Sequence, residues 1–247
     1  MLRRTSSQTI AYAGRRPRLD KSESLFVGYS ARNRRFTRQF FLAAAQLAAR
    51  CFDSLTVAIL DVPYAFNDAA KRGESNPSPA EFARARQIGD ERERMVKRVL
   101  HSSPGLTWSL LRWEDLEDSS VRNLRKELTW ALRKPSELRF ELLESASNWA
   151  GSAGVVSSAE LLGFQIAELP LLLSIYYQRS LLVDLYPGEL TPFFFDLEAG
   201  RWSHELPTAT AITGGQRLSL IDFASAAPTA STQAVGVDFP LEELVSR

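Results

Sequence analysis

Two short apolar runs with a helical stretch between them constrain the fold of this chain most strongly. Residues 24–30 (SLFVGYS) end in glycine and serine, whereas residues 54–61 (SLTVAILD) are rich in β-branched side chains and stop at Val62-Pro63. Both runs have the length and composition of buried strands. Residues 40–52 between them are apolar and rich in alanine, which favours a helix. This βαβ unit predicts a parallel sheet with a right-handed crossover.

The rest of the chain continues the alternation of strands and helices. Residues 80–101 carry apolar side chains on one helical face, residues 106–113 read as a strand, and the helical composition continues to about residue 149. Gly151–Gly154 predicts a break, and Ser157-Ser-Ala-Glu160 has the pattern of a capping box. Residues 181–186 read as a further strand.

Taken together, these segments predict one α/β domain over residues 21–206, with a mainly parallel sheet flanked by helices. Residues 1–20 are basic and lack an apolar period, so we expect a weakly ordered arm, either solvated or touching phosphate. Residues 207–247 turn to Thr, Ala, Ser and Gly, and we expect a weakly ordered tail there.

Composition excludes several classes of protein. With 45% hydrophobic and 24% charged residues, the chain of 247 residues is typical of a globular domain. Its single cysteine, Cys51, permits no intramolecular disulfide and no cysteine cluster for a metal. The N-terminus lacks the apolar segment of a secretory signal, and the apolar window 161–173 is too short to cross a bilayer. We therefore expect a cytoplasmic protein without a membrane partner.

Ser30 is the first candidate for a chemical role. It ends a predicted strand, and the active site of an open parallel sheet lies outside the carboxyl ends of its strands. Gly28 lets the backbone turn closely, so that main-chain N–H groups near Ser30 can face a developing oxyanion. The alternative is a serine that only caps or forms a turn.

Arginine is concentrated near this serine and on the predicted helix 80–101. Arg32, Arg34, Arg35 and Arg38 follow Ser30, although the net charge of the chain is only +1. The helix adds a basic outer face that comprises Arg84, Arg86, Arg94, Lys97, Arg98 and His101. Such clusters favour a phosphate backbone as partner. The alternative for the helix is a solvated face, because Asp90, Glu91 and Glu93 interrupt it.

The sequence lacks the signatures of the common catalytic sites. His101 and His204 are the two histidines, and no Gly-x-Ser-x-Gly elbow, Walker loop or Gly-x-Gly-x-x-Gly turn is present. We therefore predict no metal and no nucleotide cofactor. A serine can still accept an acyl group if the ester is already activated and a carboxylate handles protons. Glu168, the lone acid within residues 161–173, is the candidate carboxylate, and an exposed position on its helix is the alternative.

Two segments together resemble a known family. Gly28-Tyr-Ser30-Ala-Arg-Asn33-Arg-Arg-Phe36 and Ile166-Ala-Glu168-Leu-Pro170 resemble the two signature regions of the tRNA-dependent cyclodipeptide synthases, which read Gly-x-Ser-x-x-Asn-x-x-Phe and Tyr-x-x-x-Glu-x-Pro. The resemblance spans roughly residues 24–205. Phe164 stands where the second signature usually has tyrosine, whose hydroxyl helps to anchor the substrate's amino group.

The resemblance implies a Rossmann-like domain similar to the catalytic domain of class I aminoacyl-tRNA synthetases, without their ATP-binding signatures. It implies that Ser30 accepts the aminoacyl group of a first aminoacyl-tRNA and that Glu168 holds its α-amino group and assists proton transfer. Tyr186 would belong to a proton relay. A second aminoacyl-tRNA would give a dipeptidyl-enzyme, from which a diketopiperazine is released.

The same resemblance extends to the surroundings of these residues. Gly28, Asn33 and Phe164 would belong to the substrate site, and the basic helix would hold the first tRNA. No cofactor is implied, and we expect a monomer. Because Phe164 lacks the hydroxyl of the family's tyrosine, three possibilities stay open. Glu168 would anchor the amino group alone, Tyr176 or Tyr177 would supply the missing hydroxyl, or the substrate would be held differently. Two alternative functions stay open, namely transfer of the amino acid to another acceptor and tRNA binding without catalysis.

Overall fold

The computed structural model describes residues 10–14, 21, 23–153, 158–179, 183–187 and 193–223. Within them a sheet of six strands has the order β1-β6-β5-β2-β3-β4. The strands are β1 (Ile10–Gly14), β2 (Ser24–Ser30), β3 (Ser54–Leu60), β4 (Trp108–Arg112), β5 (Val183–Tyr186) and β6 (Ser219–Phe223). All neighbouring pairs are parallel except β1 and β6. The predicted α/β fold with a mainly parallel sheet is confirmed.

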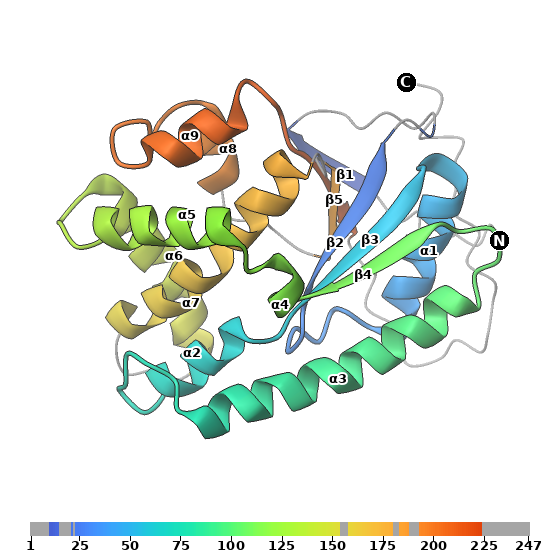
Figure 1. Cartoon of the computed structure of the whole chain (residues 1–247), viewed down its shortest axis with the longest axis horizontal. Coiled ribbons are helices and arrows are strands. Elements are labelled where there is room, and N and C mark those ends of the chain that lie inside the picture. Colours follow the sequence, from blue (N-terminus) through green and yellow to red (C-terminus); the bar gives the residue numbers. More distant parts are fainter. Residues whose placement is uncertain are drawn as a thin grey trace, which may run out of the picture.

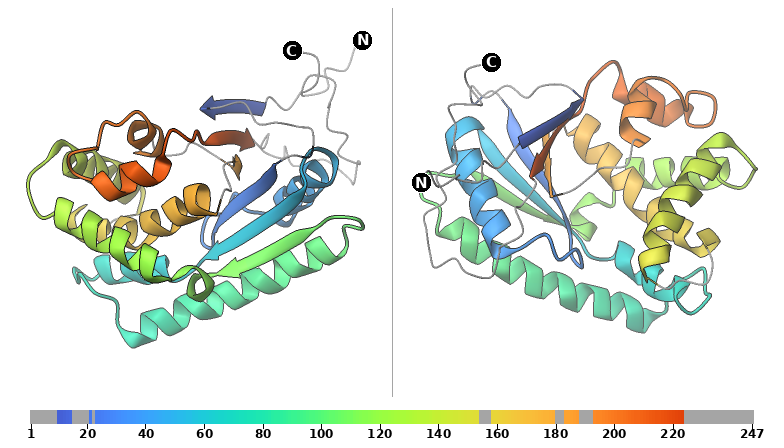
Figure 2. Two further views of the ribbon diagram at one scale, coloured as in Figure 1. Left: turned by 45° about the horizontal axis from the view of Figure 1, so that its top comes forward. Right: turned by 180° about the vertical axis from the view of Figure 1, so that it is seen from behind.

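Helices cover both faces of this sheet (Figures 1 and 2). They are α1 (Arg38–Cys51), α2 (Pro63–Ala70), α3 (Pro79–His101), α4 (Trp113–Leu116), α5 (Ser119–Ala131), α6 (Glu137–Ala153), α7 (Ser158–Leu173), α8 (Phe193–Glu198) and α9 (Pro207–Thr213). A π-helical turn, η1 (Ser174–Gln178), follows α7 directly. The long helix α3 runs along the lower edge of Figure 1.

The alternation of side chains along β2 divides the core into two parts. Leu25, Val27 and Tyr29 point to one face of the sheet, where they pack with α1 and α3. Phe26 points to the other face, where it packs with residues of α5 to α9 and η1. All four side chains are buried, as expected for a strand in the middle of a parallel sheet.

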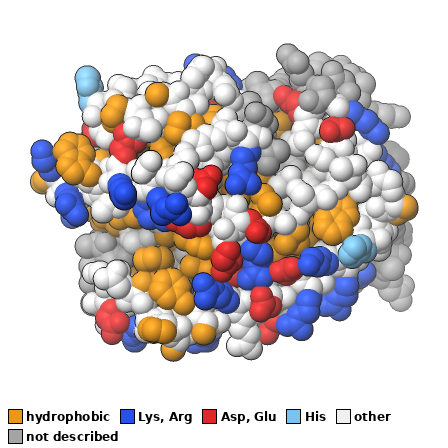
Figure 3. Space-filling model, viewed as in Figure 1, with side chains coloured by type: hydrophobic (Ala, Val, Ile, Leu, Met, Phe, Trp, Pro, Cys, Tyr) orange, Lys and Arg blue, Asp and Glu red, His pale blue; other side chains and the backbone are white. Residues whose placement is uncertain are grey.

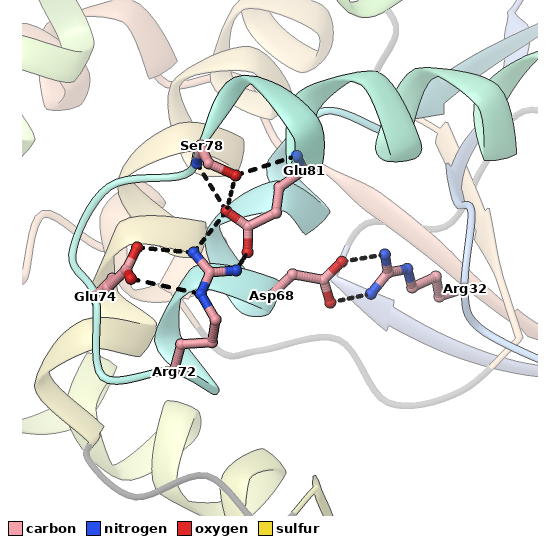
Figure 4. A network of polar contacts seen from close by, with 6 residues as sticks. All are labelled: Arg32, Asp68, Arg72, Glu74, Ser78 and Glu81. Carbon is pink, nitrogen blue, oxygen red and sulfur yellow. Dashed lines mark hydrogen bonds and ion pairs between the residues drawn. The ribbon is translucent and has the colours of Figure 1, made fainter.

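Side chains at the helix starts explain where two predicted helices begin. The Thr37 hydroxyl accepts a hydrogen bond from the Phe40 amide at 3.1 Å and caps α1. Ser78 and Glu81 form a capping box at the start of α3, in which the Ser78 amide donates to Glu81 Oε2 at 2.7 Å. Arg72 joins this box to the end of α2 through ion pairs with Glu81 and Glu74 (Figure 4).

The structure differs from the sequence predictions in two inner segments. Val62-Pro63 does more than stop a strand, because Pro63 opens α2 at a position where the missing N–H costs nothing. Helix α6 continues to Ala153, through Gly151, where we predicted a break. Residues 154–157, which complete that break and begin the predicted capping box, lie outside the described residues.

Three elements also lie inside the terminal segments for which we predicted weak order. Strand β1 falls within residues 1–20, and α9 and β6 fall within residues 207–247. The edge strand β1 pairs with β6 from the other end of the chain, so its structure depends on a partner that no local pattern shows. The sheet therefore extends beyond the predicted domain bounds of 21–206, and the rest of both segments lies outside the described residues.

Candidate active site

The strand order places a topological switch point between β2 and β5. From β2 the chain moves to β3 and β4 on one side, while β5 and β6 lie on the other. Ligands of open α/β sheets bind where the strand order reverses, outside the carboxyl ends of the strands. Ser30 is the last residue of β2 and Tyr186 is the last residue of β5. The expected position of Ser30 at a carboxyl strand end is confirmed.

A cavity of about 600 Å³ opens at this switch point. Its lining includes all the residues that we predicted as catalytic or substrate-binding, from β2, the turn after it, α7 and β5. They are Gly28, Ser30, Asn33, Phe164, Glu168 and Tyr186. Residues far apart in the sequence thus meet around one space large enough for an amino acid with its attached group.

A residue that the sequence analysis missed contacts the candidate nucleophile. The hydroxyl groups of Ser30 and Tyr64 form a hydrogen bond. Tyr64 lies in the first turn of α2, which directly follows β3, and its ring packs edge-on against Phe164 with centroids 5.3 Å apart. Burial raises the pKa of Tyr64 well above its usual value, and the nearby Glu168 carboxyl group adds to this rise. The Tyr64 hydroxyl therefore keeps its proton at neutral pH.

Asn33 connects the turn after β2 to β5. Its backbone amide donates a hydrogen bond to the Ser30 carbonyl at 2.9 Å. Its side-chain Nδ2 donates to the Tyr186 hydroxyl at 3.4 Å. Its Oδ1 accepts from the Arg35 amide at 3.0 Å. Burial raises the pKa of Tyr186, and the Glu168 carboxyl group adds to this rise. The turn therefore holds Ser30 and Tyr186 in a fixed relation.

Glu168 projects from α7 toward the same cavity. Of the two alternatives for this acid, an exposed helix face is excluded, because the side chain is partly buried and lines the cavity. Burial raises the pKa of Glu168 to about 8. A carboxyl group with such a pKa can carry or release a proton near neutral pH.

A second buried carboxyl group, Asp184 on β5, also lines the cavity. The Tyr176 hydroxyl donates to Asp184 Oδ2 at 2.6 Å. Burial raises the pKa of Asp184 to about 7, although Tyr176 and the Gly28 backbone favour the charged form. The sequence analysis missed this acid because it lies within a predicted strand and was assigned no role.

The structure also locates the two tyrosines that we considered as substitutes at position 164. Tyr177 does not line the cavity, and its hydroxyl donates to Glu198 at 2.6 Å. Tyr176 lines the cavity, but its hydroxyl is bonded to Asp184. The tyrosine that contacts Phe164 is instead Tyr64.

The arginines after Ser30 have different surroundings. Arg32 forms a two-pronged ion pair with Asp68 of α2 (Figure 4), and its Cζ atom lies 5.7 Å from the centroid of the Tyr64 ring. Arg35 is exposed and donates to the Pro187 carbonyl at 3.2 Å, and Arg34 is exposed as well. The charge of Arg32 is thus offset within the protein, whereas Arg34 and Arg35 lie at the surface.

Helix α3 has the predicted amphipathic character. Ala85, Val96, Val99 and Leu100 are buried, and the predicted basic residues Arg84, Arg86, Arg94, Lys97 and Arg98 are exposed. Acidic side chains lie among them, and Figure 3 shows the mixture along the lower edge of the molecule. Arg86 pairs with Glu114 at 3.1 Å and Lys97 with Glu93 at 2.6 Å. The face is therefore basic, with part of its charge offset by acids.

Both histidines lie away from the cavity. His101 and His204 are exposed, and neither lines it. Among the described residues no three His, Cys, Asp or Glu side chains are grouped in a way that could hold a metal ion. No helix in the described part of the chain is long and apolar enough to span a membrane.

The sequence matches no family model and no curated protein sequence. Its structure resembles that of a cyclodipeptide synthase from Fluoribacter dumoffii, with a TM-score of 0.68 and 13% identity over 88% of this chain and 99% of that chain. A synthase from Candidatus Glomeribacter gigasporarum, solved with bound Phe-tRNAPhe, has a TM-score of 0.54 and 15% identity over 88% and 93% of the two chains.

A third similar structure is a Mycobacterium tuberculosis protein that relates cyclodipeptide synthetases to type I tRNA synthetases. It has a TM-score of 0.53 and 17% identity over 77% of this chain and 87% of that chain. The chain therefore has the fold of the cyclodipeptide synthases.

Proposed function

We propose that the protein synthesises cyclodipeptides from two aminoacyl-tRNAs through an aminoacyl-enzyme on Ser30. The observation that carries this proposal is the meeting of Ser30, Glu168 and Tyr186 around one cavity, in a chain with the fold of the cyclodipeptide synthases. An aminoacyl-tRNA ester is already activated, so a serine can accept its acyl group without a histidine.

In the first step the Ser30 Oγ attacks the carbonyl carbon of the ester. A bond forms between Oγ and this carbon, and the bond from the carbon to the terminal ribose oxygen breaks. The hydroxyl proton of Ser30 must reach the leaving ribose oxygen. Tyr64 supports this transfer, because its protonated hydroxyl is already hydrogen-bonded to Ser30 and can donate one proton as it accepts another.

In the second step the α-amino group of the bound aminoacyl residue attacks the carbonyl carbon of the ester of a second aminoacyl-tRNA. A peptide bond forms between this nitrogen and that carbon, the bond from the carbon to the terminal ribose oxygen breaks, and the leaving ribose oxygen takes up a proton. This amine must lose a proton to become a nucleophile. The pKa of Glu168 is about 8, close to the ~7.7–8.0 of an α-amino group, so a proton can pass between them at little cost. Glu168 therefore both pairs with the ammonium form and takes up its proton.

The third step releases the product. The free amine of the dipeptidyl group attacks the ester on Ser30, the ring closes, and Ser30 Oγ leaves and regains a proton. Tyr186 lies 3.4 Å from Asn33 Nδ2 and has a pKa raised by burial, so its hydroxyl is a protonated donor beside this ester. Asn33 fixes the orientation of that hydroxyl.

We assign the nucleic-acid contact to the basic face of α3. The synthase from Candidatus Glomeribacter gigasporarum was solved with bound Phe-tRNAPhe, and this chain shares its fold. Exposed cations that include Arg84, Arg94 and Arg98 can pair with successive phosphates. Arg34 and Arg35 are exposed and directly follow Asn33, which lines the cavity, so they suit the acceptor end of the tRNA.

Expression in a bacterium followed by mass spectrometry of the medium tests the proposal. We expect diketopiperazines from the wild type and none from Ser30→Ala. Ser24→Ala is the matched control, because Ser24 lies at the opposite end of β2 and bonds to Ser54 at 2.8 Å. Equal diketopiperazine profiles from the wild type and Ser30→Ala would refute the proposal.

A further inference from the structure

We propose that Asp184 selects a basic side chain, so that the aminoacyl group carried to Ser30 is arginyl or lysyl. This inference rests on the function proposed above, because it concerns the substrate of the same cavity. It is carried by the position, burial and hydrogen bonding of Asp184, together with the balance of charges around the cavity.

The Asp184 carboxyl group is buried and incompletely bonded. The residue is 1% exposed, yet it contributes to the cavity lining. Oδ2 accepts a hydrogen bond from Tyr176 at 2.6 Å, and the Gly28 backbone also favours the charged carboxylate, whereas Oδ1 is buried without a hydrogen-bond partner in the described part of the chain. A buried polar atom without a partner is costly unless a ligand supplies one. Since the atom belongs to a cavity residue, a donor on the substrate can supply this bond.

The carboxyl groups around the cavity have no cationic partner among the described residues. Among the described lining residues, Glu168 and Asp184 are the acidic ones, and Arg32 and Lys71 are the basic ones. Arg32 is paired with Asp68, and Lys71 lies exposed at the end of α2. The α-ammonium group of the substrate matches Glu168. A second cation, on the substrate's side chain, would match Asp184.

The depth of Asp184 requires a long side chain. In the sheet Asp184 lies opposite Phe26, four residues before Ser30 on β2. At about 3.3 Å per residue the backbones are roughly 13 Å apart along the strand. The Asp184 carboxyl group reaches toward the Gly28 backbone, which leaves about 7 Å along the strand to Ser30, still too far for a short donor such as a serine hydroxyl. Arginine and lysine carry their charge at the end of an extended stem and can span much of this distance.

The walls between these two points suit such a stem. Leu142, Leu169, Leu172 and Phe194 line the cavity and offer apolar surface to methylene groups. Gly28 lines the cavity without a side chain, and a β-carbon there would crowd the Phe26 ring at 3.3 Å and contact Leu172 at 3.7 Å. An apolar passage that ends in a carboxylate is complementary to a cation on an aliphatic chain.

Transfer from individually charged tRNAs tests this inference. The full-length protein is mixed with tRNAs that carry arginine, lysine, methionine, leucine or tyrosine, and the adduct on Ser30 is measured by intact-protein mass spectrometry. We expect transfer from the arginyl or the lysyl tRNA to be fastest, and the faster of the two identifies the substrate. This comparison among tRNAs uses the wild type and needs no variant.

Asp184→Asn then tests the residue itself. It keeps an acceptor for Tyr176 but removes the charge, so we expect transfer of the basic aminoacyl group to fall roughly 10- to 100-fold. Transfer of the methionyl group should be unchanged or faster. Asp53→Asn, at an exposed position before β3, is the control for a change of charge alone. Because both substrates are compared on one protein, a folding defect would slow both and is recognised.

The outcomes separate this inference from the proposed function. Preferred transfer of leucyl, methionyl or tyrosyl groups would overturn the assignment of Asp184 and leave aminoacyl transfer to Ser30 intact. Equal losses for basic and apolar groups, in an Asp184→Asn protein that unfolds at the same urea concentration as the wild type, would also overturn the assignment. Transfer from none of the tRNAs would overturn the proposed function, and this inference with it.

Discussion

The hydroxyl groups of Ser30 and Tyr64 share a hydrogen bond at the carboxyl ends of the neighbouring strands β2 and β3. The two residues are 34 positions apart, and the parallel pairing of Ser30 with Leu60 brings the start of α2 beside the end of β2. Neither histidine of the chain lines the cavity. Among the described residues, the phenol of Tyr64 is thus the side chain that is hydrogen-bonded to the Ser30 hydroxyl.

The first prediction concerns this hydrogen bond. Tyr64→Phe should slow transfer of the aminoacyl group from tRNA to Ser30 by about 10²-fold or more, because a positioned proton donor typically contributes 10²–10⁴-fold. The ring and its packing against Phe164 are kept, so folding should be unchanged. Single-turnover kinetics with charged tRNA, followed by quenching and mass spectrometry, measure the rate.

Tyr177→Phe is the matched control for that substitution. It removes a hydroxyl that bonds to Glu198, outside the cavity lining, and should leave the transfer rate within about twofold of wild type while costing about 1 kcal/mol in stability. A wild-type transfer rate in Tyr64→Phe would exclude Tyr64 from the proton path.

The second prediction follows from the raised pKa of Glu168. Its usual value of 4.5 rises to about 8 on folding, so between these limits the folded protein keeps a proton that the unfolded chain has lost. The free energy of unfolding must therefore fall as the pH rises through this window. Glu168→Gln removes this dependence and should be more stable than the wild type near pH 8, by several kcal/mol at most since one pKa unit is worth about 1.4 kcal/mol.

Urea unfolding at several pH values measures this effect. Near pH 4.5 the two proteins should converge, because Glu168 is then protonated in the folded state and half-protonated in the unfolded chain. Asp184 titrates in both proteins, so their difference isolates Glu168. Glu91→Gln, at an exposed position of α3, should follow the wild-type curve. A constant difference between Glu168→Gln and the wild type across this range would contradict the assigned burial.

Local patterns predicted much of the fold and part of the site. The strands β2, β3 and β4 and the end of β5 lie where apolar runs predicted them, and Ser30 ends the first of these strands. Burial of a strand or helix is visible in the period of its side chains, so these elements could be found without knowledge of their neighbours.

The missed features depend on contacts between distant segments. Strands β1 and β6 pair across almost the whole chain, so no nearby part of the sequence shows the partner of either strand. The parallel pairing of β2 with β3 brings Tyr64 beside Ser30, and the pairing of β5 with β2 brings Asp184 to the same cavity. A sequence shows the types of these residues, whereas their meeting at one cavity is set by the strand order.

The third prediction concerns the basic face of α3. Arg94→Ala combined with Arg98→Ala should weaken tRNA binding and lower the slope of log affinity against log salt by about 1 to 2, since each phosphate contact releases counterions. Both side chains are exposed, and within the described residues they donate to backbone carbonyls of their own helix. Binding of tRNA measured at several salt concentrations gives the slope.

The control for this variant removes the same charge elsewhere. Arg133→Ala with Lys134→Ala, at exposed positions after α5, should leave the salt slope closer to the wild-type value. An unchanged slope in the α3 variant would remove this helix from the tRNA interface, and equal changes in both variants would mean that only the total charge matters.

A buried ion pair fastens α3 to the sheet. Arg112, the last residue of β4, donates to Asp61 after β3 at 2.6 Å, and to Asp90 and Glu93 of α3 at 2.8 and 2.6 Å. Burial raises the pKa of Asp61, and Arg112 opposes this rise. Gly89 of α3 packs directly against the side chains of Asp61 and Arg112, so a side chain at position 89 would occupy the same space as this ion pair.

The last prediction is that Gly89→Ala destabilises the protein, although alanine favours a helix over glycine by about 1 kcal/mol. A β-carbon at position 89 would lie 2.0 Å from Asp61 Oδ2 and 2.6 Å from an Arg112 guanidinium nitrogen, so α3 or the ion pair must move. We expect a loss of about 1–3 kcal/mol in the free energy of unfolding, as for other overpacked sites. Gln87→Ala, at an exposed position of α3, should change stability by less than about 0.5 kcal/mol in the same urea titration. A stabilised Gly89→Ala would mean that helix propensity outweighs this contact and that α3 does not pack closely over Asp61.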